Sequence, residues 1–388
     1  MLRPSPEFQK RLDLQARTSI EGRALTIEQR RLKGRNRLNG LIAATALLGV
    51  GVGQYASDVR ANQEIQAEAS INIQIASPAL DPANNHKALI FFNGLGTDNA
   101  EAITKFTGHS LQPILDGQRW SIGYNNAPLE KTVFAKKLIE AAHEQNADTF
   151  IFVGRSAGGN IIMQAQEEVR KYSSITIEAI VLDSTPVDIE ALRPARQEEI
   201  AIAHTIARIP GAEYSSAVRS IGEMASRIDS YNFGTPWQRI ENFATTYTHV
   251  NESIDNNKLP GMWLMFGQLL AIQDTDFESR MENIAKLPKS VVRPTMLYLH
   301  TAEPGVDPVV DTEKSSKAIA AFAHKYGIPF LDYGINGAVH THPEIAVDAY
   351  AQTLTKAKVT ILSTIAAEAA RASSHRITSR FYPAPPKN

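Results

Sequence analysis

The sequence predicts an α/β fold in which a mostly parallel sheet is flanked by helices. From residue 70 onward, short runs of β-branched and aromatic residues alternate with longer segments of helical periodicity, a pattern typical of parallel sheets. One of the apolar runs ends in the pentapeptide Gly-Arg-Ser-Ala-Gly at 154–158, and a helical pattern follows it. The chain has 388 residues, 43% of them hydrophobic, so it can bury a large core.

Seven segments have the composition of strands. Residues 71–75 alternate apolar with polar side chains, which favours a half-exposed edge strand. The apolar segments expected to form buried strands are 88–92, 120–124, 149–153, 179–182, 295–299 and 329–333. The helices expected between and after these strands cover about 130–145, 159–172, 311–326 and 344–371.

The alternation of strands and helices stops between residues 185 and 288. This stretch has helical patterns only, over 193–209, 215–230, 237–247 and 259–272. We therefore divide the body of the chain into an α/β core over 70–186 and 288–372 and a helical cap over 187–287. The side chains of Met262, Trp263 and Phe266 fit two interpretations. They bind substrate beneath the cap, or they form the core of the cap itself, as apolar helical stripes usually do.

The two ends of the chain differ in composition from its body. Residues 1–37 are rich in arginine and lysine, and the apolar run that follows has about 17 residues without a charge, the short limit for a membrane span. We expect 38–56 to be an uncleaved transmembrane anchor. A cleaved signal segment and a glycine-rich soluble helix are the alternatives. Residues 57–69 are expected to be a linker, and the proline-containing segment 373–388 a tail.

The charge distribution also predicts a location. Basic residues on the N-terminal side of an anchor keep that side in the cytoplasm, so the chain is expected to cross the membrane once, with its catalytic body outside the cytoplasm. Cleavage of the segment would give a secreted protein instead. The formal net charge of −1 gives no electrostatic reason to expect a nucleic acid partner, and the absence of cysteine excludes disulfides, thiolate catalysis and cysteine-ligated metals.

The pentapeptide at 154–158 makes Ser156 the candidate nucleophile. A serine at a sharp turn between a strand and a helix has strained backbone, and glycines two positions to either side let the neighbouring chain segments pass without a clash. Gly154 and Gly158 occupy those two positions. Arg155, beside the serine, has two interpretations that the sequence leaves open: it binds a substrate carboxylate, or it forms an internal salt bridge.

Candidate partners for Ser156 follow other predicted strands, and parallel sheets gather such groups at the carboxyl ends of their strands. Glu303 and Asp307 follow the strand at 295–299, while His340 and His342 follow the strand at 329–333. A serine nucleophile needs a base and a carboxylate that orients the base. We favour His340 over His342 because of its position in the loop. We favour Asp307 over Glu303 and over Asp183, which follows a different strand. The two histidines lack a further cluster of ligands, so no metal is expected.

These motifs resemble the α/β-hydrolase fold serine hydrolases of the esterase and lipase type, with a helical cap, over about residues 70–372. The resemblance rests on Asn-Gly-Leu-Gly at 93–96, the turn at Ser156, Asp-Pro-Val-Val at 307–310 and a late histidine, in the order Ser, Asp, His. It implies that Ser156 is the nucleophile, Asp307 the orienting acid and His340 the base. The backbone N–H groups of Leu95 and Ala157 would form the oxyanion hole.

The resemblance further implies hydrolysis of a small-molecule ester or lipid-like acyl substrate through an acyl-enzyme, without a cofactor. Three alternatives use the same fold: an acyltransferase, a thioesterase and a non-catalytic binding protein. The sequence departs from the family at Asn93-Gly94, where many relatives have His-Gly.

Overall fold

The computed structural model describes residues 71–95, 100–124, 129–194, 196–197, 220, 224, 231, 235–255, 262–340 and 343–381. The chain forms two compact units, one of Met1–Asp58 with Ser216–Glu252 and one of Val59–Ser215 with Ser253–Asn388. The second unit contains the α/β body. The predicted anchor at 38–56, the basic segment at 1–37 and the linker at 57–69 lie outside the described residues.

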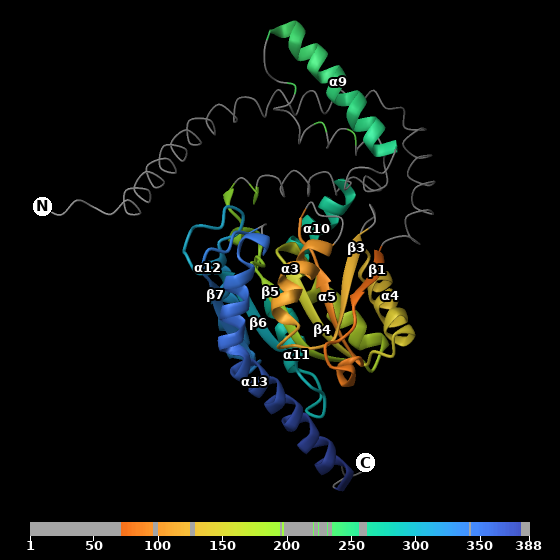
Figure 1. Ribbon diagram of the computed structural model, residues 1–388, viewed down its shortest axis with the longest axis vertical. Coiled ribbons are helices and arrows are strands. Elements are labelled where there is room, and N and C mark those ends of the chain that lie inside the picture. Colours follow the sequence, from red (N-terminus) through yellow and green to blue (C-terminus); the bar gives the residue numbers. More distant parts are fainter. Residues whose placement is uncertain are drawn as a thin grey trace, which may run out of the picture. The chain divides into compact units, whose positions relative to one another are not determined.

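The α/β body is built on a seven-stranded sheet with the order β1-β3-β2-β4-β5-β6-β7 (Figure 1). β1 pairs antiparallel with β3, and every other neighbouring pair is parallel. The strands are β1 (Ile71–Ser77), β2 (Lys87–Phe92), β3 (Gln118–Tyr124), β4 (Thr149–Arg155), β5 (Thr176–Asp183), β6 (Thr295–Thr301) and β7 (Phe330–Ile335). All seven strands expected from the sequence are confirmed, and the mostly parallel α/β fold with them.

Helices cover both faces of this sheet and enclose two separate cores. Successive strand residues point to opposite faces, so Ile90 and Phe152 pack in one core while Leu89 and Val153 pack in the other. The first face is covered by α4 (Lys131–Glu144), α5 (Ala157–Tyr172), α11 (Phe277–Ala285) and α12 (Thr312–Tyr326). The second is covered by α3 (Glu101–Leu111) and α13 (Val347–Phe381). Short 3₁₀ turns at Pro82–Asn84, Ile189–Ala191 and Pro343–Ile345 complete the body.

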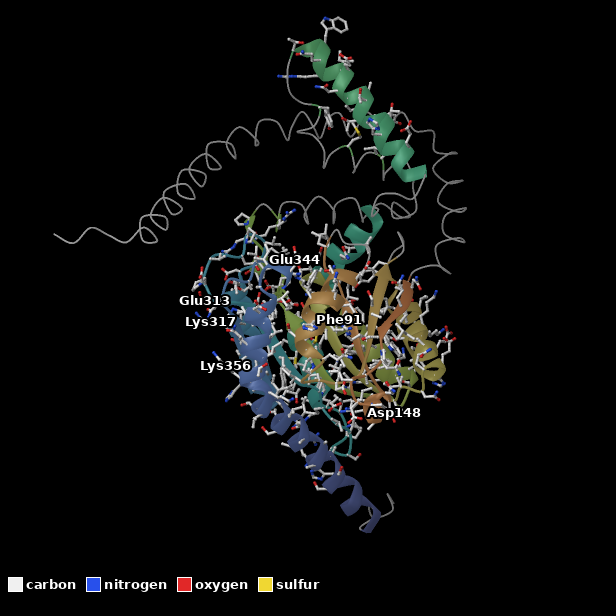
Figure 2. The ribbon with its side chains drawn as sticks, in the orientation of Figure 1. Phe91, Asp148, Glu313, Lys317, Glu344 and Lys356 are labelled. Carbon is white, nitrogen blue, oxygen red and sulfur yellow. The ribbon has the colours of Figure 1, made fainter. Side chains whose placement is uncertain are left out.

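The side chains follow the same division between interior and surface (Figure 2). Phe91 is fully buried between the sheet and its helices. Glu313 and Lys317, one turn apart on α12, form an exposed ion pair at 2.6 Å. Pairs of this kind contribute little to stability, so packing on the two faces of the sheet holds the body together.

The end of the predicted cap belongs to the α/β body. α10 (Met262–Asp274) packs on α5, where the Gln164 side chain donates to the backbone oxygen of Ala271 at 3.1 Å and to the Thr275 hydroxyl at 2.8 Å. α11, which the sequence patterns did not predict, places Phe277 and Met281 in the core beside α5. α13 also runs further than expected, to Phe381, because no proline interrupts it before residue 383.

α9 (Pro236–Asp255) belongs mostly to the other compact unit. A reciprocal capping box starts it: the Thr235 N–H donates to the Gln238 side chain at 2.8 Å, and the Gln238 N–H donates to the Thr235 hydroxyl at 3.4 Å. Within the parts of the chain that the structure describes, no helix combines the length and the hydropathy needed to cross a bilayer.

Candidate active site

Ser156 lies directly after β4 in a backbone conformation that most residues avoid. Its φ is +51° and its ψ is −127°, which costs a non-glycine residue free energy and occurs where the surrounding structure enforces it. The enforcing contacts are the hydrogen bond from the Ser156 N–H to the Asp183 backbone oxygen, 2.8 Å, and the immediate start of α5 at Ala157. The hydroxyl is therefore presented at the carboxyl end of the sheet.

Glycines surround this turn because side chains would not fit. A β-carbon on Gly158 would lie 2.4 Å from the Phe92 backbone oxygen, and one on Gly154 would lie 2.6 Å from the Gly159 nitrogen. A β-carbon on Gly94 would lie 2.7 Å from that of Ser156. The loop after β2 and the start of α5 thus approach each other at backbone contact around the serine.

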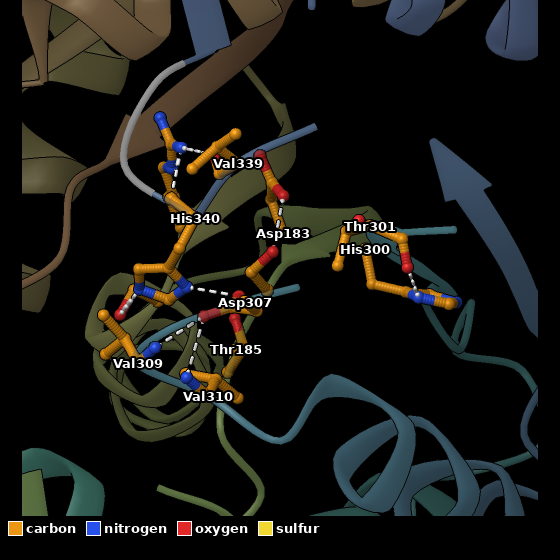
Figure 3. A network of polar contacts seen from close by, with 12 residues as sticks. Asp183, Thr185, His300, Thr301, Asp307, Val309, Val310, Val339 and His340 are labelled. Carbon is orange, nitrogen blue, oxygen red and sulfur yellow. Dashed lines mark hydrogen bonds and ion pairs between the residues drawn. The ribbon is translucent and has the colours of Figure 1, made fainter. Parts of the chain in front are cut away.

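His340 joins Ser156 to Asp307 in a chain of two hydrogen bonds (Figure 3). Its Nε2 lies 3.0 Å from the Ser156 Oγ, and its Nδ1 lies 2.7 Å from the Asp307 Oδ2. All three side chains are buried, with 7%, 4% and 1% of Ser156, His340 and Asp307 exposed. The structure thus brings together the three residues favoured by the sequence, from positions after β4, β6 and β7.

The Asp307 carboxylate is held by the backbone that follows it. Its Oδ1 accepts hydrogen bonds from the N–H groups of Val309 and Val310, both at 2.9 Å, which leaves Oδ2 for His340. An Nδ1–H donated to this carboxylate gives the imidazole the tautomer in which Nε2 is an acceptor. That nitrogen faces the Ser156 hydroxyl, so it can accept its proton.

The two predicted oxyanion donors belong to the turn after β2 and to the start of α5. Ala157 is the first residue of α5, and the first N–H groups of a helix have no acceptor within it. Leu95 follows Gly94, where an added β-carbon would lie 3.2 Å from the Ser156 Oγ. Asn93 shapes this turn: its side-chain oxygen accepts from the Gly94 N–H at 2.9 Å, and its backbone oxygen accepts from the Tyr124 hydroxyl at 3.2 Å.

The alternative residues are placed differently. Glu303 is exposed on the loop after β6, with its N–H 3.4 Å from the Thr301 hydroxyl, whereas Asp307 is buried beside His340. His342 lies outside the described residues, as do the side chains of Met262, Trp263 and Phe266, although these three positions fall in α10.

Three further residues of the site are Arg155, Asp183 and Tyr350. The sequence offered Arg155 as a substrate-binding candidate and Asp183 as a less favoured acid, and it did not mark Tyr350. Arg155 donates from Nη2 to the backbone oxygens of Val339, at 3.1 Å, and His340. It therefore binds the histidine loop through backbone oxygens, a role that differs from both the substrate carboxylate and the salt bridge expected from the sequence. The Tyr350 hydroxyl lies 3.0 and 2.9 Å from the two carboxylate oxygens of Asp183. The positions of Arg155 and Asp183 at strand ends were a usable signal, but nothing marked Tyr350 within its helix.

Burial raises the pKa values of Asp183 and Tyr350. Asp183 is fully buried, and desolvation raises the pKa of its carboxyl, while the nearby charge of Arg155 acts in the opposite direction. Desolvation, together with the charge of Asp183, raises the pKa of Tyr350 well above its usual value. Tyr350 is therefore a neutral hydroxyl donor to Asp183.

No family model matches the chain, and no curated protein matches it. Solved structures that resemble it include a carboxyl esterase from Bacillus coagulans, at 11% identity and a TM-score of 0.48, covering 76% of this chain and 94% of the esterase. A thermophilic esterase from Thermogutta terrifontis is 13% identical, with a TM-score of 0.44, and the match covers 75% of this chain and 93% of that esterase. A bromoperoxidase from Bacillus anthracis is 14% identical, with a TM-score of 0.43, and the match covers 76% of this chain and 94% of the bromoperoxidase. In its sheet order, its turn at Ser156 and the chain order of its Ser, Asp and His, this protein has the α/β-hydrolase fold.

Proposed function

We propose that this protein is a serine hydrolase that cleaves a carboxylic ester through an acyl-enzyme intermediate. The observation that carries the proposal is the buried chain of contacts from the Ser156 Oγ through His340 to Asp307, at 3.0 and 2.7 Å. A binding protein has no need for a strained serine, an imidazole and a carboxylate in this order. The resemblance of the motifs to esterases and lipases favours an ester as the substrate class.

In the proposed first step, His340 accepts the proton of Ser156 as the Oγ attacks the ester carbonyl carbon. The C=O π electrons move to oxygen, and the backbone N–H groups of Leu95 and Ala157 stabilise the resulting anion. The intermediate collapses, the bond from carbon to the alcohol oxygen breaks, and His340 returns its proton to the leaving alcohol. Asp307 keeps the imidazole oriented and stabilises its positive charge while it holds the proton.

In the second step water takes the place of the serine as nucleophile. His340 removes a proton from water, the hydroxide adds to the acyl carbon, and collapse breaks the bond to the Ser156 Oγ, which recovers a proton from His340. The products are a carboxylic acid and free enzyme. An acyltransferase would differ only in that an alcohol replaces water, and a thioesterase only in that a thiol leaves in the first step.

The test is labelling of the purified protein with a fluorophosphonate, followed by hydrolysis of p-nitrophenyl acetate. We expect the wild type to label and to release p-nitrophenol, Ser156→Ala to do neither, and His340→Ala to label slowly. A folded wild type that neither labels nor hydrolyses would contradict the proposal and leave the binding protein as the better interpretation. Faster release of p-nitrophenol with an added alcohol, together with formation of the alcohol ester, would identify an acyltransferase.

We also propose that residues 38–56 anchor the protein in a membrane, with the catalytic body outside the cytoplasm. The charge-free apolar run and the basic residues before it support this. Alkaline phosphatase fused after residue 65 should be active, because that reporter works only outside the cytoplasm, and a cytoplasmic reporter at the same point should be silent. The opposite pair of results would refute the proposed orientation, and release of the reporter from the membrane would indicate cleavage.

A further inference from the structure

Arg155 is buried beside the nucleophile, and its contacts are made with a distant part of the chain. Only 5% of the residue is exposed. Its Nη2 donates to the backbone oxygens of Val339 and His340, and its Nε has no hydrogen-bond partner among the described residues. The two carbonyl oxygens are therefore the groups that fix this guanidinium, and the guanidinium in turn fixes the backbone that carries the imidazole.

The loop that bears His340 needs such support. It leaves β7 after Ile335 and passes through Gly337, which has a φ of +71°, before it reaches His340. No strand or helix holds the backbone of Val339 and His340. Arg155, by contrast, is the last residue of β4 and pairs in register with Asp183 of β5. A rigid strand end thus holds an irregular loop, and it does so one residue from Ser156.

The charge of Arg155 is balanced by groups in the same region. A buried guanidinium is costly without a compensating charge. Arg155 pairs with Asp183 in the sheet register, and the charge of Arg155 lowers the pKa of the Asp183 carboxyl against the larger effect of desolvation. Tyr350 of α13 donates to that carboxylate, which fixes its orientation. The Asp183 backbone oxygen also accepts from the Ser156 N–H. Asp183 therefore contacts the nucleophile turn, and Arg155, its partner in the sheet register, contacts the histidine loop.

We propose that Arg155, Asp183 and Tyr350 form a positioning group, which we call the brace. It holds the imidazole of His340 at proton-transfer distance from Ser156. The proposal rests on the proposed hydrolase function. The brace touches neither substrate nor the reacting atoms, so its loss is expected to lower kcat and leave KM unchanged. An error of about 1 Å in the placement of a catalytic group can reduce the rate about 100-fold.

The experiment compares Arg155→Met, Arg155→Lys and Tyr350→Phe with the wild type in p-nitrophenyl acetate hydrolysis and in the rate of fluorophosphonate labelling. We expect Arg155→Met to lose about 100-fold in both rates, with KM within about twofold. Lysine keeps the charge but lacks the planar fork of donors, so Arg155→Lys should recover part of the loss. Tyr350→Phe, which removes one hydroxyl, should lose roughly three- to tenfold, as expected for one hydrogen bond of about 1 kcal/mol.

Arg170 provides the matched control. It is also largely buried, on the far end of α5, where its Nε donates to Gln166 at 3.0 Å and burial lowers the pKa of its guanidinium to about 10. Arg170→Met should lower the melting temperature and leave kcat unchanged. An equal loss of kcat in Arg170→Met and Arg155→Met would show a general effect of removing a buried arginine and would overturn the brace.

A second measurement separates the brace from the proposed function. The Nδ1–H of His340, held by Asp307, should give a low-field proton resonance that disappears in His340→Ala. We expect this resonance to broaden or shift in Arg155→Met and Tyr350→Phe, whether or not the wild type hydrolyses esters. An inactive wild type with a resonance that responds to the brace variants would refute the hydrolase only. An unchanged resonance and unchanged kcat in Tyr350→Phe would overturn the brace, even if Arg155→Met fails to fold.

Discussion

Two neighbouring strands, β4 and β5, end in similar ways and lead to different chemistry. Each ends in a charged residue followed by a serine with positive φ: Arg155 and Ser156 after β4, Asp183 and Ser184 after β5. The φ values are +51° and +48°. Each serine N–H also donates 2.8 Å to the next strand, to the oxygens of Asp183 and Leu299 respectively. Backbone geometry alone therefore does not distinguish a candidate nucleophile.

The difference lies in what surrounds each hydroxyl. The Ser156 Oγ faces His340 Nε2 at 3.0 Å, and a helix begins at the next residue. The Ser184 Oγ lies 3.4 Å from the carboxylate of its own neighbour, Asp183. After Ser184 the chain continues into Thr185 and Pro186 without starting a helix. A nucleophile thus requires the imidazole and the helix start in addition to the strained turn, and the comparison can be tested one group at a time.

The largest expected difference between the two strand ends is the loss of kcat when each serine is replaced by alanine. Ser156→Ala should reduce kcat for p-nitrophenyl acetate by about 10⁴- to 10⁶-fold, because the nucleophile is lost and only binding and the oxyanion donors remain. Ser184→Ala should change kcat by less than about twofold, since the described partner of its hydroxyl is the Asp183 carboxylate and not an imidazole. Steady-state kinetics of the two purified variants measure the difference. A large loss in Ser184→Ala would show that the two strand ends share the chemistry.

The next effect concerns the two buried carboxyl groups, Asp307 and Asp183. Asp307→Asn should reduce kcat by about 10⁴-fold, because an amide in place of the carboxylate favours the wrong tautomer of His340. Asp183→Asn should reduce it by about tenfold, since Asp183 acts on His340 through the brace and not by direct contact. The same kinetic assay ranks the two variants, with circular dichroism to confirm folding. A ranking in the reverse order would make Asp183 the orienting acid.

The sequence predicted most of this site because its residues sit at strand ends with recognisable local patterns. Ser156 is flanked by glycines at fixed spacing, and Asp307 follows a buried apolar segment by eight positions in the chain. His340 was favoured over His342 on loop position, and the structure places it 2.7 Å from Asp307. Alternation of apolar and polar residues predicted β1, and continuous apolar runs rich in β-branched and aromatic residues predicted the other six strands.

The features that the sequence did not predict depend on long-range contacts. Tyr350 joins Asp183 across 167 positions of the chain, and no local pattern marks such a pair. α3 and α11 were missed because each is short, at 11 and 9 residues, so few turns were available to establish a helical period. The division of 187–287 between two compact units also depends on contacts that periodicity does not report.

The close approach of backbone around Ser156 gives the third prediction. Gly158→Ala should lower the free energy of unfolding by about 1–3 kcal/mol, because the new β-carbon would lie 2.4 Å from the Phe92 backbone oxygen. Gly123→Ala in β3 is the control, since its β-carbon would meet Asn72 atoms at 3.6 Å, an ordinary contact distance. Urea denaturation measures both. Equal stability of the two variants would show that the start of α5 can shift without cost.

The smallest expected effect comes from a second His–Asp pair, on the neighbouring strands β6 and β7. His300 lies 3.1 Å from the Asp332 carboxylate through Nε2 and 2.7 Å from the Thr301 backbone oxygen through Nδ1. Desolvation lowers the pKa of His300, but the hydrogen bond and charge of Asp332 outweigh it, so the pKa of His300 is raised. Unlike His340, this imidazole faces no predicted nucleophile, so its protonation should affect stability and not turnover.

Because the pKa of His300 is raised in the folded state, protonated His300 stabilises the fold fully at pH values below the unfolded-state pKa of about 6.5. This stabilisation is lost as the pH rises through the folded-state pKa. His300→Gln should therefore lower the free energy of unfolding at pH 5.5 and not at pH 9, by less than about 1 kcal/mol because water screens the pair. When Asp332→Asn is already present, His300→Gln should no longer lower the free energy of unfolding at pH 5.5. Urea denaturation at the two pH values measures these free energies. A change in the pH profile of ester turnover in His300→Gln would instead connect this pair to the active site.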